Sequence, residues 1–319
     1  MKILISDKTE NDVIKKLKDA GHEVIFNEMD PNTLLKEISN YDALMVRSRT
    51  KVIKEVVEAG AKGKLKVIGR AGIGVDNIDI QTAAKNKIKV VNAPTGATSS
   101  VAELAILHML ALSRQLPKAD STTKKGEWLK KQFKGNELFG KTLGLVGTGN
   151  IGKLLAKYAK AFNMQVIGYD PFIPADVMGK DGIKKIDDLG KLIEASDFIS
   201  LHIPHTPETH YIINEKMLAK MKPTAYLINC ARGGTVDEKA LYNALKNGKL
   251  AGAAMDVFEQ EPPAKDNPLL TLENVVVTPH IGANTKEGQL RAGIITAEQM
   301  MKVLDGKTPD FWVNKKFFT

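Results

Sequence analysis

A glycine-rich segment in the middle of the chain has the spacing of a phosphate-binding turn. Gly147-Thr148-Gly149-Asn150-Ile151-Gly152 directly follows a predicted strand, Leu143-Gly144-Leu145-Val146, and precedes a helical pattern. In a strand–turn–helix setting the first glycine permits the tight turn, the second lets the backbone approach a pyrophosphate, and the third lets helix and strand pack closely. The N–H groups at the start of the helix would bind phosphate oxygens. The segment therefore predicts a dinucleotide site at Gly147, Gly149 and Gly152.

Asp170 indicates which dinucleotide is bound. It ends the next predicted strand, at 165–170, about twenty residues beyond the glycine segment, where a carboxylate accepts hydrogen bonds from the adenosine ribose. A 2′-phosphate would meet its negative charge, and Pro171-Phe172 provide no arginine to neutralise that phosphate. The sequence therefore favours NAD over NADP.

A single arginine follows a later predicted strand at 224–228. The segment is Asn229-Cys230-Ala231-Arg232-Gly233-Gly234. Ligands of parallel sheets bind outside the carboxyl ends of the strands, and a guanidinium is suited to the carboxylate of a keto or hydroxy acid. We expect Arg232 to bind substrate. Cys230 has no histidine near it in sequence, and we interpret it as a small buried side chain and not as a nucleophile.

Two further polar segments, each stiffened by proline, follow the next predicted strands. They are Asp256-Val257-Phe258-Glu259-Gln260-Glu261-Pro262-Pro263 and Thr278-Pro279-His280-Ile281-Gly282-Ala283. Hydride transfer from a C–OH group needs a residue that takes the hydroxyl proton, and histidine suits this role near neutral pH. A neighbouring carboxylate would stabilise the imidazolium and orient the ring. Glu261 and His280 could form this pair if the two loops meet.

Three other histidines offer an alternative site. His202, His205 and His210 could bind a metal, but His202 and His205 lie on a strand that runs into a proline loop and do not share one helical face. No Asp or Cys completes the set at a useful spacing. We therefore predict no metal, and expect these histidines to line the cofactor site.

Composition places the chain among ordinary globular proteins. Its 319 residues correspond to about two domains, and no stretch approaches the ~18 apolar residues of a membrane span. The net charge of +9 comes mostly from lysines scattered among acids, which is typical of a solvated surface and argues against a nucleic-acid partner. The apolar stretch within residues 1–7 is too short to be the hydrophobic region of a signal peptide. A single cysteine fits a reducing compartment, so we expect a cytoplasmic protein.

Strand and helix patterns alternate along most of the chain, which predicts parallel sheets built from βαβ units. We predict strands at 2–6, 23–26, 43–46, 66–68 and 89–91, and then at 142–146, 165–169, 197–201, 224–228, 251–254 and 274–277. Helices are predicted between them at 10–20, 31–39, 51–60, 79–86, 151–162, 187–195, 214–220 and 237–247. Longer helices at 99–116, ending before Pro117, and at 285–304 would connect the two halves. The glycine segment favours two open sheets over one barrel.

Taken together, these motifs resemble the D-isomer-specific 2-hydroxyacid dehydrogenases over nearly the whole chain. The resemblance rests on the glycine segment, residues 229–234, Asp256-Val257-Phe258 with Glu261-Pro262, and residues 279–283 in that order. It implies an α/β fold with two Rossmann-like or flavodoxin-like parallel-sheet domains, the N-terminal one completed by the C-terminal helix. Residues 1–98 and 286–319 would form the substrate-binding domain, and residues 99–285 the NAD-binding domain.

The resemblance also implies roles for individual residues. Arg232 would bind substrate, Glu261 would pair with His280, and His280 would exchange the proton. Cofactor contacts would include Asn150, Ile151, Asp170, Cys230, Ala231, Arg232, Asp256, His280, Gly282 and Ala283. Members of this family are usually homodimers through the NAD-binding domain, with the helix at 99–116 involved.

Two N-terminal stretches resemble the branch of the family that oxidises D-3-phosphoglycerate. They are residues 46–52 and 69–77, which carry Arg47, Arg49 and Arg70 at strand ends. Half of the six arginines lie there, which suits a substrate with both phosphate and carboxylate groups. The resemblance predicts substrate contacts at Arg47, Arg70, Ala71 and Gly72 in addition to Arg232 and His280. Arg49 and Ile73 depart from the residues usual in that branch.

Other functions remain open at this point. A glyoxylate or hydroxypyruvate reductase would need no phosphate site, and the arginines could instead pair with acidic residues. Some relatives are NAD-sensing corepressors, although the sequence has no disordered, motif-bearing tail. The chain ends about fifteen residues after the last long helix, so we expect no C-terminal regulatory domain.

Overall fold

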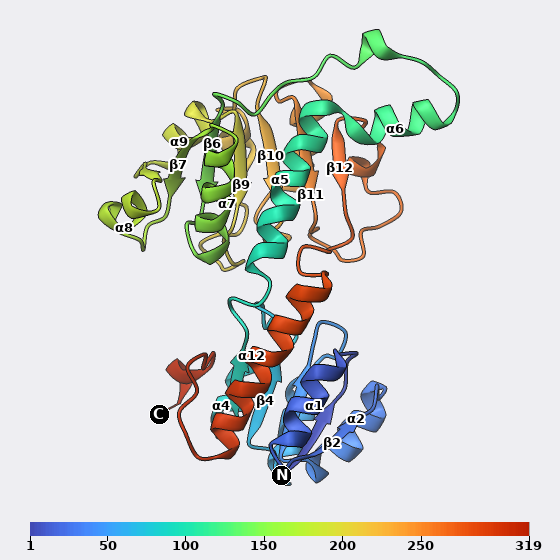
Figure 1. The fold of residues 1–319 in the computed structure, drawn as a ribbon, viewed down its shortest axis with the longest axis vertical. Helices are drawn as coiled ribbons and strands as arrows, with labels where there is room; N and C mark the ends of the chain where they lie inside the picture. Colours follow the sequence, from blue (N-terminus) through green and yellow to red (C-terminus); the bar gives the residue numbers. More distant parts are fainter. Residues whose placement is uncertain (319) are drawn as a thin grey trace. The chain divides into compact units, whose positions relative to one another are not determined.

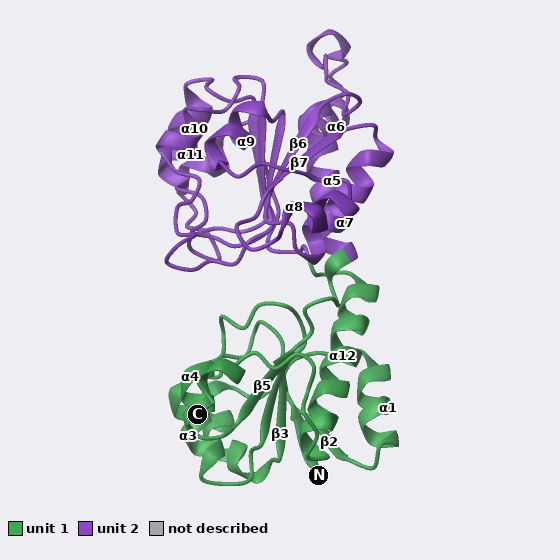
Figure 2. Ribbon diagram, turned by 90° about the vertical axis from the view of Figure 1, so that its left-hand side faces the viewer, with its two compact units in different colours: residues 1–98, 283–319 green, residues 99–282 purple. Residues whose placement is uncertain are grey.

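The computed structural model describes residues 1–318, which divide into two compact units. Unit 1 comprises residues 1–98 and 283–319, and unit 2 comprises residues 99–282 (Figure 2). Each unit is a parallel sheet with helices on both faces, so the predicted α/β class is confirmed. No helix in the described chain is long and apolar enough to cross a membrane.

Unit 1 has a five-stranded sheet in the order β2-β1-β3-β4-β5, which is the flavodoxin-like order. Its strands are β1 (Lys2–Ile5), β2 (Glu23–Phe26), β3 (Ala43–Val46), β4 (Val67–Arg70) and β5 (Lys89–Asn92). Its helices are α1 (Asn11–Asp19), α2 (Pro31–Glu37), α3 (Lys54–Ala61), α4 (Ile80–Lys85) and α12 (Lys286–Leu304), with short 3₁₀ turns at Ile38–Asn40 and Lys315–Phe317.

The strands of unit 1 are buried on both faces. Along β1, Ile3 and Ile5 belong to a core shared with α1 and α12, whereas Leu4 belongs to a core on the opposite face. This alternation follows from the two-residue repeat of a strand. Helix α12 lies beside α1 against the sheet (Figure 1), so the C-terminal helix completes unit 1 as predicted.

Unit 2 has a seven-stranded sheet in the order β12-β11-β10-β9-β6-β7-β8. The strands are β6 (Thr142–Val146), β7 (Gln165–Tyr169), β8 (Lys184–Lys185), β9 (Phe198–Leu201), β10 (Tyr226–Asn229), β11 (Gly252–Met255) and β12 (Val275–Val277). Strand order reverses between β6 and β9, which makes this the Rossmann order with one additional strand. Ligands of such sheets bind at the reversal point, at the carboxyl ends of the strands.

Helices cover both faces of this sheet. They are α5 (Thr98–Arg114), α6 (Leu116–Lys124), α7 (Asn150–Ala161), α8 (Ala175–Lys180), α9 (Leu189–Ala195), α10 (Glu215–Leu218) and α11 (Glu238–Lys246), with 3₁₀ turns at Lys130–Gln132 and Pro268–Thr271. Helices α9, α10 and α11 lie on one face, and α5 and α7 lie on the other (Figure 2).

All eleven predicted strands form, but four elements of unit 2 were missed or misjudged. The short strand β8 and the helices α6 and α8 were not predicted. The helix predicted at 99–116 ends at Arg114, because Gln115 adopts a left-handed conformation with φ of 50°. Pro117 then lies in the first turn of α6, a position where proline has no helical hydrogen bond to lose.

Candidate active site

The glycine segment forms the predicted turn between β6 and α7. A Cβ at Gly147, where φ is 92°, would lie 2.5 Å from the His202 carbonyl oxygen, and one at Gly152 would lie 2.4 Å from the Gly147 carbonyl oxygen. A Cβ at Gly149 would meet no atom within 4 Å. Gly149 also caps α7 without any side-chain hydrogen bond to the first turn. The open space and the uncapped N–H groups of Asn150 and its neighbours fit the pyrophosphate of a dinucleotide.

Asp170 lies directly after β7, and its side chain points back to the glycine turn. Its Oδ2 accepts hydrogen bonds from the Thr148 backbone N–H at 2.9 Å and from the Thr148 hydroxyl at 3.2 Å, and its Oδ1 accepts one from the Phe172 N–H at 3.0 Å. A carboxylate can accept about four hydrogen bonds, so one position is left for a ribose hydroxyl. Asp170 therefore fits the ribose and also fixes the turn, a role that its position in sequence did not indicate.

The turn after β10 holds Arg232 through the side chain of Asn229. Asn229 is fully buried, and its amide nitrogen donates to the Arg232 carbonyl and to the Thr235 hydroxyl, both at 3.1 Å. Its amide oxygen accepts from the Ala231 N–H at 3.0 Å. A Cβ at Gly233 would lie 1.8 Å from the Phe258 carbonyl oxygen, so only glycine fits there. This buried amide at a strand end was a signal for a positioning role that the sequence analysis did not use.

Glu261 and His280 meet as the sequence analysis expected. His280 Nδ1 lies 2.7 Å from Glu261 Oε2, and the Phe258 N–H donates to Glu261 Oε1 at 3.2 Å. Burial alone would raise the pKa of the Glu261 carboxyl, but the hydrogen bonds and the charges of His280 and Arg232 outweigh this and lower the pKa. Glu261 is therefore ionised at neutral pH and accepts the Nδ1 proton, so the Nε2 atom of His280 is the one available for proton exchange.

Asp256, directly after β11, holds the loop that carries His280. Its Oδ1 accepts from the Ile281 N–H at 2.8 Å and from the Thr278 hydroxyl at 2.6 Å, and its Oδ2 accepts from the Gly282 N–H at 2.8 Å. The Asp256 backbone carbonyl accepts from the His280 N–H at 2.8 Å. One acceptor position of the carboxylate is left for a cofactor amide.

The remaining candidates of unit 2 do not form a reactive cluster. Burial raises the pKa of the Cys230 thiol, and the charge of Asp256 adds to the effect, so the thiol stays protonated. His205 Nε2 pairs with His210 Nδ1 at 3.0 Å, whereas His202 Nε2 pairs with the Ser200 hydroxyl at 2.9 Å. Burial lowers the pKa of His202 to about 4, so its ring is neutral near pH 7.

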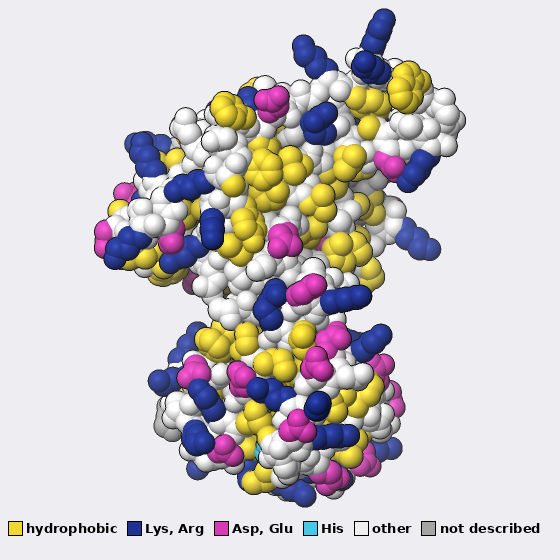
Figure 3. Space-filling view, viewed as in Figure 1, with side chains coloured by type: hydrophobic (Ala, Val, Ile, Leu, Met, Phe, Trp, Pro, Cys, Tyr) yellow, Lys and Arg dark blue, Asp and Glu magenta, His cyan; other side chains and the backbone are white. Residues whose placement is uncertain are grey.

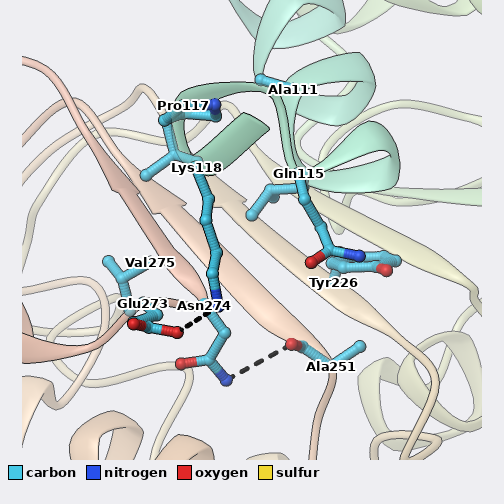
Figure 4. A pocket seen from close by; sticks show the side chains of 11 residues that line it. Ala111, Gln115, Pro117, Lys118, Tyr226, Ala251, Glu273, Asn274 and Val275 are labelled. Atoms are coloured by element: carbon cyan, nitrogen blue, oxygen red, sulfur yellow. Dashed lines mark hydrogen bonds and ion pairs between the residues drawn. The ribbon is translucent and has the colours of Figure 1, made fainter. Parts of the chain in front are cut away.

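A cavity of about 250 Å³ lies at the opposite edge of the unit 2 sheet. Its lining includes Tyr226 and Val275, the first residues of β10 and β12, and the α5–α6 junction at Gln115 (Figure 4). Its rim carries an ion pair between Lys118 and Glu273 at 2.6 Å. Because the candidate residues follow the carboxyl ends of the same strands, this cavity is separate from them.

The N-terminal arginines lie at the carboxyl ends of two neighbouring strands of unit 1. Arg70 is the last residue of β4 and pairs in register with Val46, the last residue of β3. Arg47 comes directly after Val46, so the two arginines lie at neighbouring strand ends. A Cβ at Gly72 would lie 1.5 Å from Arg70 Nη1, so the guanidinium of Arg70 lies against the backbone of Gly72. Arg47 is half-buried, and burial lowers the pKa of its guanidinium, although Asp7 and Glu10 oppose the shift.

Asp7, two residues beyond the end of β1, holds the loop that carries Arg47. It is 3% exposed, and its Oδ1 accepts from the Thr50 hydroxyl at 2.6 Å, while its Oδ2 accepts from the Arg47 N–H at 2.5 Å. Arg49 Nε forms an ion pair with Asp7 at 3.0 Å. From the other side, the Asn77 amide donates to the carbonyls of Arg47 and Thr50 at 2.8 and 2.7 Å. Arg49 therefore balances part of the charge of Asp7.

Comparison with known proteins supports this arrangement of motifs. Residues 106–282 match the family model for the NAD-binding domain of D-isomer specific 2-hydroxyacid dehydrogenases, which is more than half of the chain. The chain belongs to this family. The predicted cofactor, NAD, agrees with the match, and so does the predicted enzyme class.

Individual relatives within the family differ in their named activity. The chain is 52% identical over 314 residues to a D-3-phosphoglycerate dehydrogenase of Methanocaldococcus jannaschii, covering 98% of this chain and 59% of that relative. It is 49% identical over 284 residues to a hydroxypyruvate reductase of Thermotoga maritima, covering 88% of this chain and 91% of that relative. A D-lactate dehydrogenase of Aquifex aeolicus, solved with NAD and lactic acid, superposes with a TM-score of 0.83 at 31% identity, covering 96% of each chain. The chain thus spans less than two thirds of the length of the phosphoglycerate dehydrogenase.

Proposed function

We propose that this dehydrogenase oxidises the 2-hydroxyl group of D-3-phosphoglycerate to 3-phosphohydroxypyruvate with NAD, a step of serine synthesis. The observation that carries the proposal is the pair of cations, Arg47 and Arg70, at adjacent strand ends of unit 1. Arg232 alone would suffice for a simple hydroxy acid, whereas a phosphate dianion calls for additional guanidinium groups. Ala71 and Gly72 would contribute backbone contacts beside Arg70.

Each of the two units would then bind one of the two reactants. Residues 1–98 and 286–319 would bind the substrate, and residues 99–285 would bind NAD. In the second part, Gly147, Gly149, Asn150, Ile151 and Gly152 would surround the pyrophosphate, and Asp170 would accept from the ribose. The remaining cofactor contacts would come from Cys230, Ala231, Arg232, Asp256, His280, Gly282 and Ala283.

The chemistry follows from the hydrogen-bond directions at His280. Arg232 binds the substrate carboxylate, which orients C2 and its hydroxyl group. The Nε2 atom of His280 takes the hydroxyl proton while the C2–H bond breaks and a carbonyl forms. NAD, held at the glycine turn and Asp170, would supply the acceptor for the hydride that leaves C2. The Glu261 carboxylate, 2.7 Å from Nδ1, stabilises the imidazolium that results. In the reverse direction His280 returns the proton.

A second candidate is the reduction of hydroxypyruvate. The relative from Thermotoga maritima that bears this name is 49% identical to the present chain and matches it over 91% of its own length. Hydroxypyruvate carries no phosphate, and only Arg232 and His280 would be needed for it.

The experiment that separates the two is a substrate panel on the purified protein. Formation of reduced nicotinamide is followed by absorbance with D-3-phosphoglycerate, D-glycerate and D-lactate, and its consumption is followed with hydroxypyruvate and glyoxylate. The proposal predicts the highest kcat/KM for D-3-phosphoglycerate. A clear preference for D-glycerate and hydroxypyruvate would instead support the second candidate.

We also propose that the protein is a cytoplasmic homodimer that forms through unit 2. No residue from 114 to 137 is buried, and Trp128 is 83% exposed. Exposed Leu107 and Leu116 lie on α5 and α6, and hydrophobic side chains gather over the face of unit 2 that carries α5 (Figure 3). Segments with so little burial within their own chain are typical of interfaces. Sedimentation would give a dimer mass, and Trp128→Lys with Leu116→Lys would shift it towards the monomer.

A further inference from the structure

The backbone at His280 adopts a conformation that few residues other than glycine favour. Its φ is 53°, in the left-handed region, where the side chain crowds the main chain. Two hydrogen bonds hold it there, from the His280 N–H to the carbonyls of Asp256 at 2.8 Å and Thr278 at 3.1 Å. A conformation of this kind persists only where the surrounding structure imposes it, so the position of His280 depends on its neighbours.

Asp256 imposes the conformation from both sides of His280. The Thr278 hydroxyl, two residues before His280, and the N–H groups of Ile281 and Gly282 after it all donate to one carboxylate that is 1% exposed. A Cβ at Gly282 would lie 3.1 Å from Asp256 Oδ2, so the loop has closed tightly on the carboxylate. Rotation of the Asp256 side chain would release all three donors together.

The Thr278 hydroxyl has a second partner, on α5. His108 Nε2 lies 3.3 Å from Thr278 Oγ1, although the two residues are 170 positions apart. The single hydroxyl proton of Thr278 must point to Asp256, because a carboxylate has no proton to donate and the distance is only 2.6 Å. His108 must therefore donate from Nε2 to the hydroxyl oxygen.

The side chain of His108 is buried, which suits a hydrogen-bond donor with one fixed orientation. It is 2% exposed on a helix, and burial lowers the pKa of its imidazole, with the charge of Asp256 opposing the shift. A neutral ring carries one N–H, and the geometry assigns it to Nε2. A lone histidine in an apolar helix carries no local signal in the sequence, so no role was predicted for His108.

We propose that His108 and Thr278 are positioning residues for His280. In this proposal His108 orients the Thr278 hydroxyl, Thr278 fixes the rotamer of Asp256, and Asp256 holds the loop so that the ring of His280 stays on Glu261. The proposal rests on the proposed role of His280 in proton transfer. Neither residue touches substrate, so each acts only through the geometry of the loop.

The test compares matched substitutions at the two positions. Thr278→Val keeps the shape but removes the hydroxyl, and Thr278→Ser restores it; His108→Leu removes the donor, and His108→Gln supplies an N–H near the position of Nε2. We expect Thr278→Val to lower kcat by about tenfold to a hundredfold with a smaller change in KM, because a shift of about 1 Å in a reacting group can cost this much. Thr278→Ser should recover most of the loss. His108→Leu should lose less, about threefold to tenfold, and His108→Gln should recover part of it.

A second readout does not depend on turnover. The ring nitrogen resonances of His280, followed by NMR in the protein without substrate or cofactor, report whether Nδ1 still donates to Glu261. Thr278→Val should shift them towards those of the Glu261→Gln variant, whereas Thr278→Ser should leave them near the wild-type values. Equal kcat losses for Val and Ser at position 278, or unchanged His280 resonances in Thr278→Val, would overturn the proposal.

A failure of the positioning proposal can be distinguished from a failure of the proposed function. If His280→Asn leaves kcat unchanged, the proton-transfer role itself is wrong. If His280→Asn abolishes turnover while Thr278→Val leaves kcat and the His280 resonances unchanged, only the positioning inference fails. A thermal melt of each variant shows whether a loss reflects partial unfolding, in which case Ser and Gln variants with wild-type stability decide the question.

Discussion

The loops that carry Arg47 in unit 1 and His280 in unit 2 are held by the same device. In each, a buried aspartate within two residues of a strand end, Asp7 or Asp256, accepts a threonine hydroxyl at 2.6 Å and backbone N–H groups of a loop beyond another strand. Parallel strands bring their carboxyl ends to one edge of a sheet, so a short acidic side chain on one strand can fix the loop of another. Both proposed functions, binding and proton transfer, thus rest on a buried carboxylate.

The two aspartates differ in how their charge is compensated. Asp7 forms an ion pair with Arg49, whose side chain is 49% exposed. Asp256 is held by hydrogen-bond donors, and one of them, the Thr278 hydroxyl, accepts in turn from the neutral ring of His108. Asp7 therefore has a cation beside it as well as neutral donors, whereas the donors to the Asp256 carboxylate are all neutral groups. The comparison predicts that defects in unit 1 alter substrate preference and that defects in unit 2 alter kcat.

The largest effect in unit 2 is expected from His280→Asn. Asparagine keeps a polar side chain but cannot exchange a proton near neutral pH, so kcat should fall about a hundredfold or more. NAD binding, measured by titration of protein fluorescence, should survive. Turnover close to the wild-type value would show that another group moves the proton. The proposed difference between unit 1 and unit 2 would then be wrong.

In unit 1, Asp7→Asn should weaken binding and stability but leave the chemistry intact. The amide would place N–H donors opposite the N–H of Arg47 or the hydroxyl of Thr50, and each unsatisfied buried group costs about 1–3 kcal/mol. Urea unfolding should show a loss of this size. The kcat for an unphosphorylated acid should stay near wild type while KM for D-3-phosphoglycerate rises. A fall in kcat equal to that of Thr278→Val would mean that the two aspartates do not differ in role.

Acid is expected to destabilise unit 2 through His202. The pKa of this residue is lowered by burial to about 4, below the 6.5 of an unperturbed histidine, and its Nδ1 has no hydrogen-bond partner in the described chain. The unfolded chain therefore takes up the proton first as pH falls, so stability is complete above about pH 6.5 and declines as the pH falls towards 4. The loss from about pH 7 to about pH 5 is on the order of 2 kcal/mol. His202→Gln should flatten this decline in urea unfolding, and an unchanged decline would assign it to other groups.

Much of this site could be predicted because its signals are local in sequence. The glycine turn and Asp170 are separated by one helix, and Glu261 and His280 each follow a strand of the same sheet. The rule that parallel strands end at one edge was sufficient to expect their meeting. The paired arginines at 47 and 70 followed from the same rule.

The residues that hold these groups in place could not be predicted in the same way. Examples are the pair Asp7 and Thr50 and the pair His108 and Thr278, which are ordinary polar residues until the fold brings the two members of each pair together. Helix α5 contributes His108 across 170 positions, and no local pattern reports such a contact. Helix α5 ends at Arg114 because the backbone of Gln115 is left-handed. Glutamine is not a helix-breaking residue type, so the sequence did not indicate this end.

The central claim is that Arg47 binds the phosphate of the substrate, and Arg47→Ala measured on two substrates tests it most directly. Each charge-assisted hydrogen bond contributes about 1.5–3 kcal/mol, so kcat/KM for D-3-phosphoglycerate should fall about tenfold to a hundredfold. The value for D-glycerate should hardly change, because its carboxylate still has Arg232. Lys51→Ala, which removes an exposed cation from the same loop, should leave both values unchanged. Equal losses on the two substrates in Arg47→Ala would contradict the phosphate role and favour hydroxypyruvate reduction.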